Sequence, residues 1–550
     1  MQETAASASL GLPDDPGLPP VRLLGDLVHR QARLRPQAPA LGGEGEAVDY
    51  AALSSALRRM AGWLAGVGVA RGDRVAVYLD KRREFVVSCF GAGDVGAVFV
   101  PVNPVLKADQ VAHILRDCDV TVLVTAGARL QSLAEVLPEC PALRRVLLVD
   151  EAPAGLALPA SLPLHAWAEV EAAPAPAGPS PVLDIDMAAI LYTSGSTGRP
   201  KGVVLSHRNL VLGAQSVAQY LGNHPGDVLL AALPLSFDAG FSQLTTAFLV
   251  GAKVVLLNYL MPRDVLKALD REGVTGLTAV PPLYIQLTQL AWPEGAGRSL
   301  RYFANTGGRM PRETLDRLRE RLPQAAPFLM YGLTEAFRST YLPPQEVDRR
   351  PDSIGRAIPN AEILVLRDDG SLCDADEPGE LVHRGPLVGM GYWNDTEKTA
   401  ERYKPLPAGV GGREAGLPLP EYAVFSGDTV RRDAEGFLYF IGRRDEMIKT
   451  SGYRVSPVEV EELLYRSGLV GECAAYGLPH EQLGQRIEVV FSPPAGGDAD
   501  ADALLAFCRR HMPAYMVPAR LCPVPGPLPR NPNGKIDRKL LQQQALSAAA

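Results

Sequence analysis

Short apolar runs alternate with helix-length segments along most of this chain, and that alternation constrains its fold more than any other feature. The runs are residues 73–79, 96–102, 120–124 and 146–149 in a first series, and 228–234, 253–257 and 276–280 in a second. Strands separated by helices predict βαβ units and therefore a mainly parallel sheet. Two consecutive series of similar length predict two related α/β subdomains.

A chain of 550 residues is too long for one hydrophobic core, so more than one domain is expected. We predict an α/β protein whose large N-terminal domain, residues 21–441, holds two α/β subdomains with mainly parallel sheets and then a β-rich segment. A small, mobile α+β C-terminal domain is predicted for residues 442–550. Residues 1–20 are predicted to be a disordered tail, and the Ala- and Pro-rich residues 151–181 a surface loop.

Composition excludes several classes of protein. The formal net charge is −7 with both signs interspersed, which argues against a nucleic-acid-binding surface. No apolar stretch approaches the roughly 20 residues of a membrane span. The seven cysteines are dispersed without a Cys-x-x-Cys pair, which indicates reduced thiols in a cytoplasmic protein. No Cys/His cluster has the spacing of a metal site.

The densest chemical signal is the run Thr-Ser-Gly-Ser-Thr-Gly-Arg-Pro-Lys-Gly at residues 193–202, which lies between two apolar runs. Glycines allow the backbone to approach a bound group, and exposed N–H groups, hydroxyls and cations can hold phosphate oxygens. A Walker A loop is excluded because Pro200 precedes Lys201 and Gly202 follows it, so no helix begins at the lysine. The alternative is a flexible linker. We interpret the run as a polyphosphate loop.

Four further clusters carry polar groups suited to a nucleotide. Tyr, Thr and Glu of the segment 331–335 suit a base, a phosphate and a Mg²⁺ ion. Asp428 follows Gly427 and could accept hydrogen bonds from ribose hydroxyls. The charged segment 442–453 and the turn 531–537, which presents Lys535, complete the set. Taken singly, each is equally consistent with a solvated turn, a linker or a frayed tail.

In order and spacing, these five motifs resemble the adenylate-forming superfamily, which includes acyl-CoA synthetases, carrier-protein adenylation domains and luciferases. The resemblance covers residues 23–541. Within it, the sequences of residues 331–342 and 351–360 are most similar to acyl-CoA ligases of exosortase and exopolysaccharide loci. It implies a set of ATP-binding residues. These are Thr193, Ser194, Gly195, Ser196, Thr197, Gly198, Lys201, Gly307, Tyr331, Asp428, Arg443 and Gly452.

The resemblance also implies individual roles. Tyr331 is expected to stack on adenine, while Asp428 and Arg443 bind the ribose hydroxyls. Thr334 is expected to contact phosphate and Glu335 to hold Mg²⁺. These two residues and Lys535 form the expected catalytic set.

Lys535 is expected to bridge the acid and the α-phosphate. It lies far along the chain from Lys201, so the small domain has to close to deliver it. In the family, the domain then rotates about a hinge, here Asp445, and opens a tunnel for a thiol that residues 449–452 would line.

Residues 233–240 depart from the sequence pattern of many family members. They carry an aromatic–histidine pair beside the acyl pocket, where this chain has Phe237 and Asp238. Adenylation domains that activate amino acids also place an Asp here, opposite the substrate ammonium. A buried carboxylate is costly without a cation. Asp238 therefore either pairs with an amino acid substrate or turns away to cap a helix, and both interpretations stay open.

The predicted function is that of an AMP-forming acid–thiol ligase. A small carboxylic acid reacts with ATP to give an acyl adenylate, and the acyl group then passes to the thiol of coenzyme A. The alternative is amino acid adenylation and loading onto the phosphopantetheine of a carrier protein. The expected cofactors are ATP, Mg²⁺ and coenzyme A, or carrier-bound phosphopantetheine. An ADP-forming phosphotransferase and an inactive nucleotide-binding scaffold are the remaining rivals.

Overall fold

The computed structural model describes thirteen stretches of the chain. These are residues 20–43, 47–156, 158–176, 178, 180–193, 200–412, 414, 416–444, 446–450, 453–480, 483–494, 496–532 and 534–549. Apart from Pro20, the predicted N-terminal tail lies outside them. The described strands form four sheets, which confirms the predicted α/β fold with a large N-terminal part and a smaller C-terminal part.

The first sheet has the strand order β7-β6-β5-β3-β4-β8-β9. Its strands are β3 (Arg74–Tyr78), β4 (Val98–Pro101), β5 (Val120–Thr125), β6 (Arg145–Leu148), β7 (Leu164–Ala166), β8 (Met187–Thr193) and β9 (Lys201–Ser206). The helical segments of this part are α2 (Tyr50–Gly66), α3 (Arg83–Val95), α4 (Ala108–Asp117), α5 (Gly127–Leu133), η1 (Leu137–Glu139) and α6 (Trp167–Ala172). All neighbours are parallel except β8 and β9, which form an antiparallel hairpin.

The second sheet has the order β16-β15-β14-β13-β12-β10-β11-β1-β2. Its strands are β1 (Pro39–Gly43), β2 (Val48–Asp49), β10 (Val228–Ala231), β11 (Lys253–Leu256), β12 (Gly276–Ala279), β13 (Tyr302–Asn305), β14 (Ala326–Tyr331), β15 (Thr340–Leu342) and β16 (Arg356–Ala357). The accompanying helical segments are α1 (Asp26–Leu34), α7 (His207–Leu221), α8 (Asp238–Val250), α9 (Pro262–Arg271), α10 (Pro281–Gln289), α11 (Arg312–Arg321), η2 (Thr334–Ala336) and η3 (Pro344–Glu346). The six central strands are parallel, and antiparallel strands complete both edges.

The two sheets do not divide the chain as the two predicted series do. Strand β1 lies at the start of the first series, yet it pairs with β11 of the second sheet. The pairing of two strands that lie far apart in the sequence leaves no local signal. The alternation of apolar runs therefore could not predict that β1 joins the second sheet. The predicted surface loop at residues 151–181 is also wrong in part, because it contains β7 and α6.

Apolar helices fill the space between the two sheets. Helix α3 of the first part and helix α8 of the second contribute Phe90 and Phe241, whose rings stack with centroids 5.6 Å apart. Phe99 of β4 stacks on Phe241 from the other side at 4.8 Å. All three side chains are fully buried. The two α/β parts therefore share one continuous core, which fixes the position of one sheet against the other.

The predicted β-rich segment and C-terminal part form the remaining two sheets. The third sheet contains β17 (Glu362–Leu366), β18 (Gly379–Arg384), β19 (Tyr403–Pro405), β20 (Tyr422–Arg432) and β21 (Leu438–Arg443), with α12 (Thr396–Arg402) beside it. The fourth contains β22 (Ile448–Thr450), β23 (Tyr453–Val455), β24 (Glu472–His480), β25 (Gly484–Ser492) and β26 (Arg520–Pro523). The C-terminal helical segments are α13 (Pro457–Arg466), α14 (Ala501–His511), η4 (Ala514–Met516) and α15 (Arg538–Ala549). The chain changes sheets between β21 and β22, around the predicted hinge Asp445, which itself lies outside the described residues.

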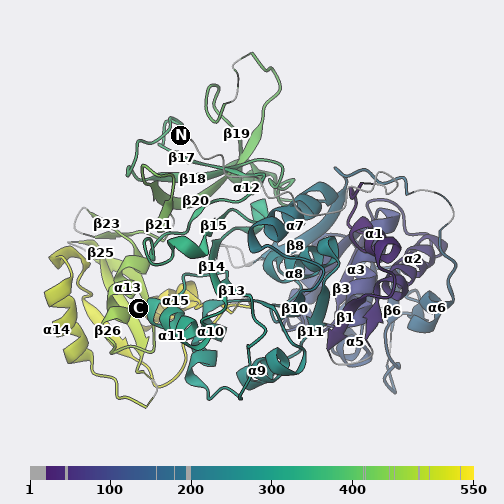
Figure 1. Cartoon of the computed structure of the whole chain (residues 1–550), viewed down its shortest axis with the longest axis horizontal. Coiled ribbons are helices and arrows are strands. Elements are labelled where there is room, and N and C mark those ends of the chain that lie inside the picture. Colours follow the sequence, from purple (N-terminus) through teal and green to yellow (C-terminus); the bar gives the residue numbers. More distant parts are fainter. Residues whose placement is uncertain are drawn as a thin grey trace.

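Figure 1 shows the first α/β part on the right, the second in the middle, the third sheet above it and the C-terminal elements at the lower left. Among the described residues, no helix is both long and apolar enough to cross a membrane. All seven cysteines are free thiols, and six of them are buried.

The start of α7 combines a serine N-cap with a buried histidine. Ser206 is the N-cap, and its Oγ accepts the N–H of Asn209 at 3.1 Å. His207 follows, fully buried, with Nδ1 accepting the N–H of Leu24 at 3.1 Å. Its Nε2 has no hydrogen-bond partner within the described parts of the chain. Burial lowers the pKa of His207 to about 4, although Asp94 and Asp186 oppose the shift.

Acidification is expected to destabilise the N-terminal part through His207. Its folded-state pKa lies below the value of about 6.5 in the unfolded chain, so the unfolded state takes up the proton first and stability falls as pH drops from 6.5 toward 4. Between pH 7 and pH 5 the loss through this residue is about 2 kcal/mol. Urea unfolding of the wild type and of His207→Gln at both pH values measures it. An exposed His511→Gln variant serves as control, and an unchanged pH dependence in His207→Gln would contradict the assignment.

Candidate active site

The predicted phosphate loop lies at the tip of the β8–β9 hairpin. Thr193, the last residue of β8, pairs directly with Lys201, the first residue of β9. The predicted residues Ser194, Gly195, Ser196, Thr197 and Gly198 lie outside the described part of the chain, as does Gly452. Lys201 Nζ lies 5.5 Å from the ring centroid of Tyr392. Burial lowers the pKa of Lys201, with a smaller opposing effect from Asp395.

A tyrosine, a carboxylate and a guanidinium meet at the end of β14. Tyr331 donates its hydroxyl to Asp428 Oδ2 at 2.5 Å, and its ring packs against Phe440 with centroids 6.2 Å apart. Asp428 of β20 lies opposite Arg443 of β21 in the ladder, with Arg443 Nε 3.4 Å from Oδ1. The three predicted adenosine-binding residues are therefore together, at the carboxyl end of a parallel strand, where α/β sheets bind ligands.

The environment of Asp428 suits a ligand with hydroxyl groups. Burial raises the pKa of this carboxyl, and the positive charge of Arg443 partly offsets the shift. Oδ1 is buried and accepts no hydrogen bond from the residues that the structure describes. An unsatisfied buried acceptor is costly, so a donor from a ligand stabilises it. Ribose hydroxyls fit this position.

Glu335 is held in place by Tyr392, which lies between β18 and α12. The Tyr392 hydroxyl donates to Glu335 Oε1 at 2.6 Å, and the Glu335 carbonyl accepts the N–H of Gly389 at 2.8 Å. Burial, and then the adjacent Glu335 charge, raise the pKa of Tyr392, so its proton stays in place to make this bond. Among described residues there is no cluster of three His, Cys, Asp or Glu ligands. A lone carboxylate suits Mg²⁺, which takes one or two protein carboxylates and completes its shell with phosphates and water.

Lys535, although exposed, lies against the N-terminal part. A Cβ added to Gly307, whose φ is +77°, would lie 3.5 Å from Lys535 Cε, which is an ordinary van der Waals contact, so the lysine side chain lies directly beside this glycine. Although the side chain keeps contact with solvent, desolvation at the junction lowers the pKa of Lys535, as does Arg443. The negative charges of Asp238 and Asp428 oppose that shift. The side chain therefore lies beside Gly307, near enough to Asp238 and Asp428 for their charges to act on its pKa.

Two further contacts fix the C-terminal elements in this arrangement. Asn103 Nδ2 donates to the carbonyl of Pro532 at 3.3 Å, three residues before Lys535. Arg309 of the N-terminal part forms ion pairs with Asp352 and with Glu462 of α13. In Figure 1 the yellow C-terminal elements accordingly lie against the teal helices of the second α/β part. The chain is thus in an arrangement that delivers Lys535 to the site.

Asp238 already has a cation from its own chain. It is the first residue of α8, after the N-cap Phe237. Its Oδ2 lies 3.5 Å from Arg338 Nη1, and its Oδ1 lies 3.5 Å from Thr334 Oγ1. Burial raises the pKa of Asp238, and Arg338 provides the largest opposing effect. The two interpretations of Asp238 stay predictions, but its carboxylate already has Arg338 as a cationic neighbour.

Sequence analysis missed Arg338, which lies three residues after Glu335. The buried Phe337 between them has φ +57°, and its ring occupies space left by Gly213 of α7, where an added Cβ would lie 2.3 Å from the ring. This left-handed turn carries Arg338 into the interior, where it is 4% exposed. A bulky residue followed by a cation directly after the Tyr-Gly-Leu-Thr-Glu motif was the available signal.

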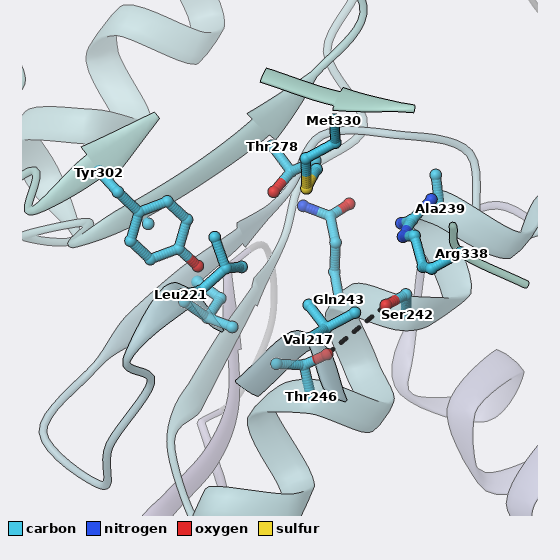
Figure 2. Close-up of a pocket in the computed structure, with 12 residues that line it drawn as sticks. Val217, Leu221, Ala239, Ser242, Gln243, Thr246, Thr278, Tyr302, Met330 and Arg338 are labelled. Carbon is cyan, nitrogen blue, oxygen red and sulfur yellow. Dashed lines mark hydrogen bonds between the residues drawn. The ribbon is translucent and has the colours of Figure 1, made fainter. Parts of the chain in front are cut away.

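Arg338 borders a pocket between α7, α8 and the second sheet (Figure 2). Five of its lining residues are polar or charged besides Arg338, and six are apolar or glycine. Helix α8 contributes four of the lining residues with the i, i+3, i+4, i+7 spacing of one helix face. These are Ala239, Ser242, Gln243 and Thr246. Tyr302 of β13 is another lining residue, and Figure 2 draws it at the end of the pocket away from Arg338.

Two α/β sheets with Tyr331, Asp428 and Arg443 grouped at the end of β14, and a lysine added from a small C-terminal part, are the arrangement of an ATP-dependent acid-activating ligase. The sequence places the chain within a family of that class. It belongs to the AMP-binding enzymes, whose family model matches residues 28–393, and the model of the AMP-binding enzyme C-terminal domain matches residues 459–535. The chain is therefore an AMP-forming acyl-CoA ligase by family.

The similar proteins act on different acids. Feruloyl-CoA synthase from Amycolatopsis sp is 31% identical over 503 residues, which cover 90% of this chain and 94% of that protein. The L-proline–[L-prolyl-carrier protein] ligase of Pseudomonas fluorescens is 28% identical over 94% of this chain and 98% of its own. The crystal structure of the anthranilate CoA ligase AuaEII in complex with anthranoyl-AMP superposes with a TM-score of 0.86, at 25% identity, over 97% of this chain and 99% of that one.

Proposed function

We propose that this protein converts a compact carboxylic acid to its acyl adenylate and then to its coenzyme A thioester. The observation that carries the proposal is the position of Lys535, whose side chain lies beside Gly307 of the N-terminal part. A cation delivered there can neutralise charge on both the acid and the α-phosphate of ATP. Relatives that act on feruloyl and anthranoyl groups support an acid of modest size.

In the first step, an oxygen of the substrate carboxylate attacks the α-phosphorus of ATP, and the bond to pyrophosphate breaks. In the second, a thiolate attacks the carbonyl carbon of the adenylate and AMP leaves. Phosphoryl transfer of this kind depends mainly on positioning and charge neutralisation. Lys535 and Thr334 act on the phosphate, while Tyr331 and Asp428 hold the adenosine.

The β8–β9 hairpin and the third sheet supply the remaining ATP-binding groups of the proposal. The loop after Thr193, together with Lys201, holds the β- and γ-phosphates, and Arg443 supports Asp428 at the ribose. Glu335, oriented by Tyr392, supplies a carboxylate for Mg²⁺, which neutralises phosphate charge when bound. The family's ATP and coenzyme A use supports these assignments.

The acceptor thiol and the domain motion belong to the same proposal. We take residues 442–550 as a domain that rotates about Asp445 after the adenylate forms, so that residues 449–452 then border the thiol path. Coenzyme A is the acceptor, with carrier-bound phosphopantetheine as the alternative that the prolyl-carrier ligase supports. Seven free thiols support a reducing, cytoplasmic location. The narrower likeness to ligases of exosortase loci remains a prediction.

Pyrophosphate release across a panel of fatty, aryl and amino acids, with and without coenzyme A, tests the proposal. We expect pyrophosphate and AMP as products. A compact acid without an ammonium group should drive their release better than an amino acid, because Arg338 already pairs with Asp238. ADP as the product would contradict the mechanism. Activity confined to amino acids and lost in Asp238→Ala would instead establish the carrier-protein alternative.

A further inference from the structure

The pocket beside Arg338 contains an unsatisfied acceptor on a buried helix. Gln243 of α8 is 7% exposed. Its Nε2 donates to the carbonyl of Leu230 at 2.6 Å. That carbonyl can only accept, so the bond fixes the amide orientation and leaves Oε1 facing away from Leu230. Among the described residues, Oε1 is buried without a hydrogen-bond partner.

The second unsatisfied group is a donor. Arg338 is 4% exposed, and its Nε is likewise buried without a partner in the described parts of the chain. Both side chains line the same pocket. In Figure 2, Gln243 rises from α8 toward Met330, with Arg338 on the side of its amide oxygen. Buried polar groups without partners are costly, so a ligand group that pairs with both of them would be stabilised in this pocket.

A hydroxyl group satisfies both requirements. It donates to the Gln243 oxygen and can accept from a guanidinium N–H, whereas an unsubstituted alkyl or aryl group does neither. A substrate ammonium would donate to Gln243 but carries the same charge as Arg338, so it is disfavoured there.

The far end of the pocket limits the length of the acid. Tyr302 lines it and is 2% exposed, and its ring lies in contact with Phe328 at a centroid distance of 6.0 Å. Asn223 Nδ2 donates to the Tyr302 hydroxyl at 3.2 Å and fixes the ring. A Cβ at Gly276 would lie 2.4 Å from that hydroxyl, so the tyrosine fits there only because residue 276 is a glycine. The tyrosine ring therefore closes this end of the pocket. A long alkyl chain would have to displace this ring.

We propose that the acid is a compact hydroxy acid, and that Gln243 is the residue that selects its hydroxyl group. This inference rests on the proposed function, because it assigns the acyl group to this pocket. The pocket then recognises the acid by an acceptor and a donor on opposite sides of one substituent. Loss of the substituent leaves both protein groups buried and unpaired, which penalises the unsubstituted acid in the transition state.

Paired substrates test this in the wild-type protein. Pyrophosphate release is measured for benzoic acid against its three monohydroxy isomers, and for butyric acid against 3-hydroxybutyric acid. We expect kcat/KM for the best hydroxy acid to exceed that of its unsubstituted partner by about 10–100-fold. Equal or faster release from both unsubstituted acids overturns the inference and leaves the proposed function standing. Release from no acid at all contradicts the proposed function itself.

A variant then assigns the preference to one residue. Gln243→Met keeps the side-chain volume and removes the acceptor, so the preference for the hydroxy acid should fall to about threefold or less while the unsubstituted acid gains. Gln219→Met, the same change at an exposed position of α7, is the matched control and should keep the wild-type ratio. Thermal melting of both variants establishes that they fold. A folded Gln243→Met protein with the wild-type ratio would show that another group reads the substituent.

Discussion

Replacing Lys535 by alanine is expected to slow acyl-adenylate formation by about 10²–10³-fold, the usual cost of removing one group that stabilises transition-state charge. The side chain lies beside Gly307, and desolvation and then Arg443 lower the pKa of Lys535, while the charges of Asp238 and Asp428 oppose that shift. Pyrophosphate release under saturating ATP measures the effect. ATP affinity, measured by calorimetry, should change little, because adenosine binds elsewhere, at Tyr331 and Asp428.

The second half-reaction separates a chemical from a structural role for this lysine. Supplied with a prepared acyl adenylate and coenzyme A, Lys535→Ala should form thioester at close to the wild-type rate, since that step needs the lysine withdrawn. Lys539→Ala changes a lysine in the following helix α15 and serves as the matched control. An equal loss in both half-reactions would indicate that the variant disturbs the domain rather than the chemistry. Unchanged pyrophosphate release would remove Lys535 from the mechanism.

Changing Glu335 to glutamine is expected to lower the rate of adenylate formation by about 10²-fold and to raise the Mg²⁺ concentration needed for half-maximal rate at least tenfold. The amide keeps the shape of the side chain but lacks the charge that a hard cation requires. A Mg²⁺ titration of pyrophosphate release at fixed ATP measures both quantities.

Tyr392→Phe provides a graded comparison for Glu335. It removes only the hydroxyl that donates to Glu335 Oε1 at 2.6 Å, so the carboxylate keeps its charge and loses its orientation. Losing such a supporting bond costs about 10-fold in metal affinity. The order of effects should be Glu335→Gln, then Tyr392→Phe, then wild type. A Glu335→Gln protein with the wild-type Mg²⁺ dependence would place the metal elsewhere.

Local patterns predicted most of the elements, since each strand and helix carries its own periodicity. The apolar runs around the glycine-rich segment, for example, are strands β8 and β9. The meeting of Tyr331 with Asp428, almost a hundred residues away, was expected only through the family resemblance. Periodicity within a segment says nothing about which distant segment it contacts.

The parts that could not be predicted depend on three-dimensional pairing. Asp238 looked like an uncompensated carboxylate because its cation, Arg338, follows a hundred residues later and is turned inward by the left-handed Phe337. Gln243 carries no sequence signal of its own. Only the burial of α8 from Ala239 to Val250 shows that its amide oxygen is enclosed without a partner among the described residues. Both residues concern the acid, which is the part of the function that the family motifs leave unspecified.

The crossing of β1 into the second sheet has a consequence for biosynthesis. Gly43 pairs with Leu256, more than 200 residues later, while the intervening chain builds the first sheet. At typical rates of translation, β1 has only its hairpin partner β2 for roughly 10–40 s after it is made. The first sheet can close during that interval, but the second cannot. Strand β1 therefore docks late, after β11 has been synthesised. A ribosome stalled before residue 256 would leave β1 accessible to proteases and chaperones.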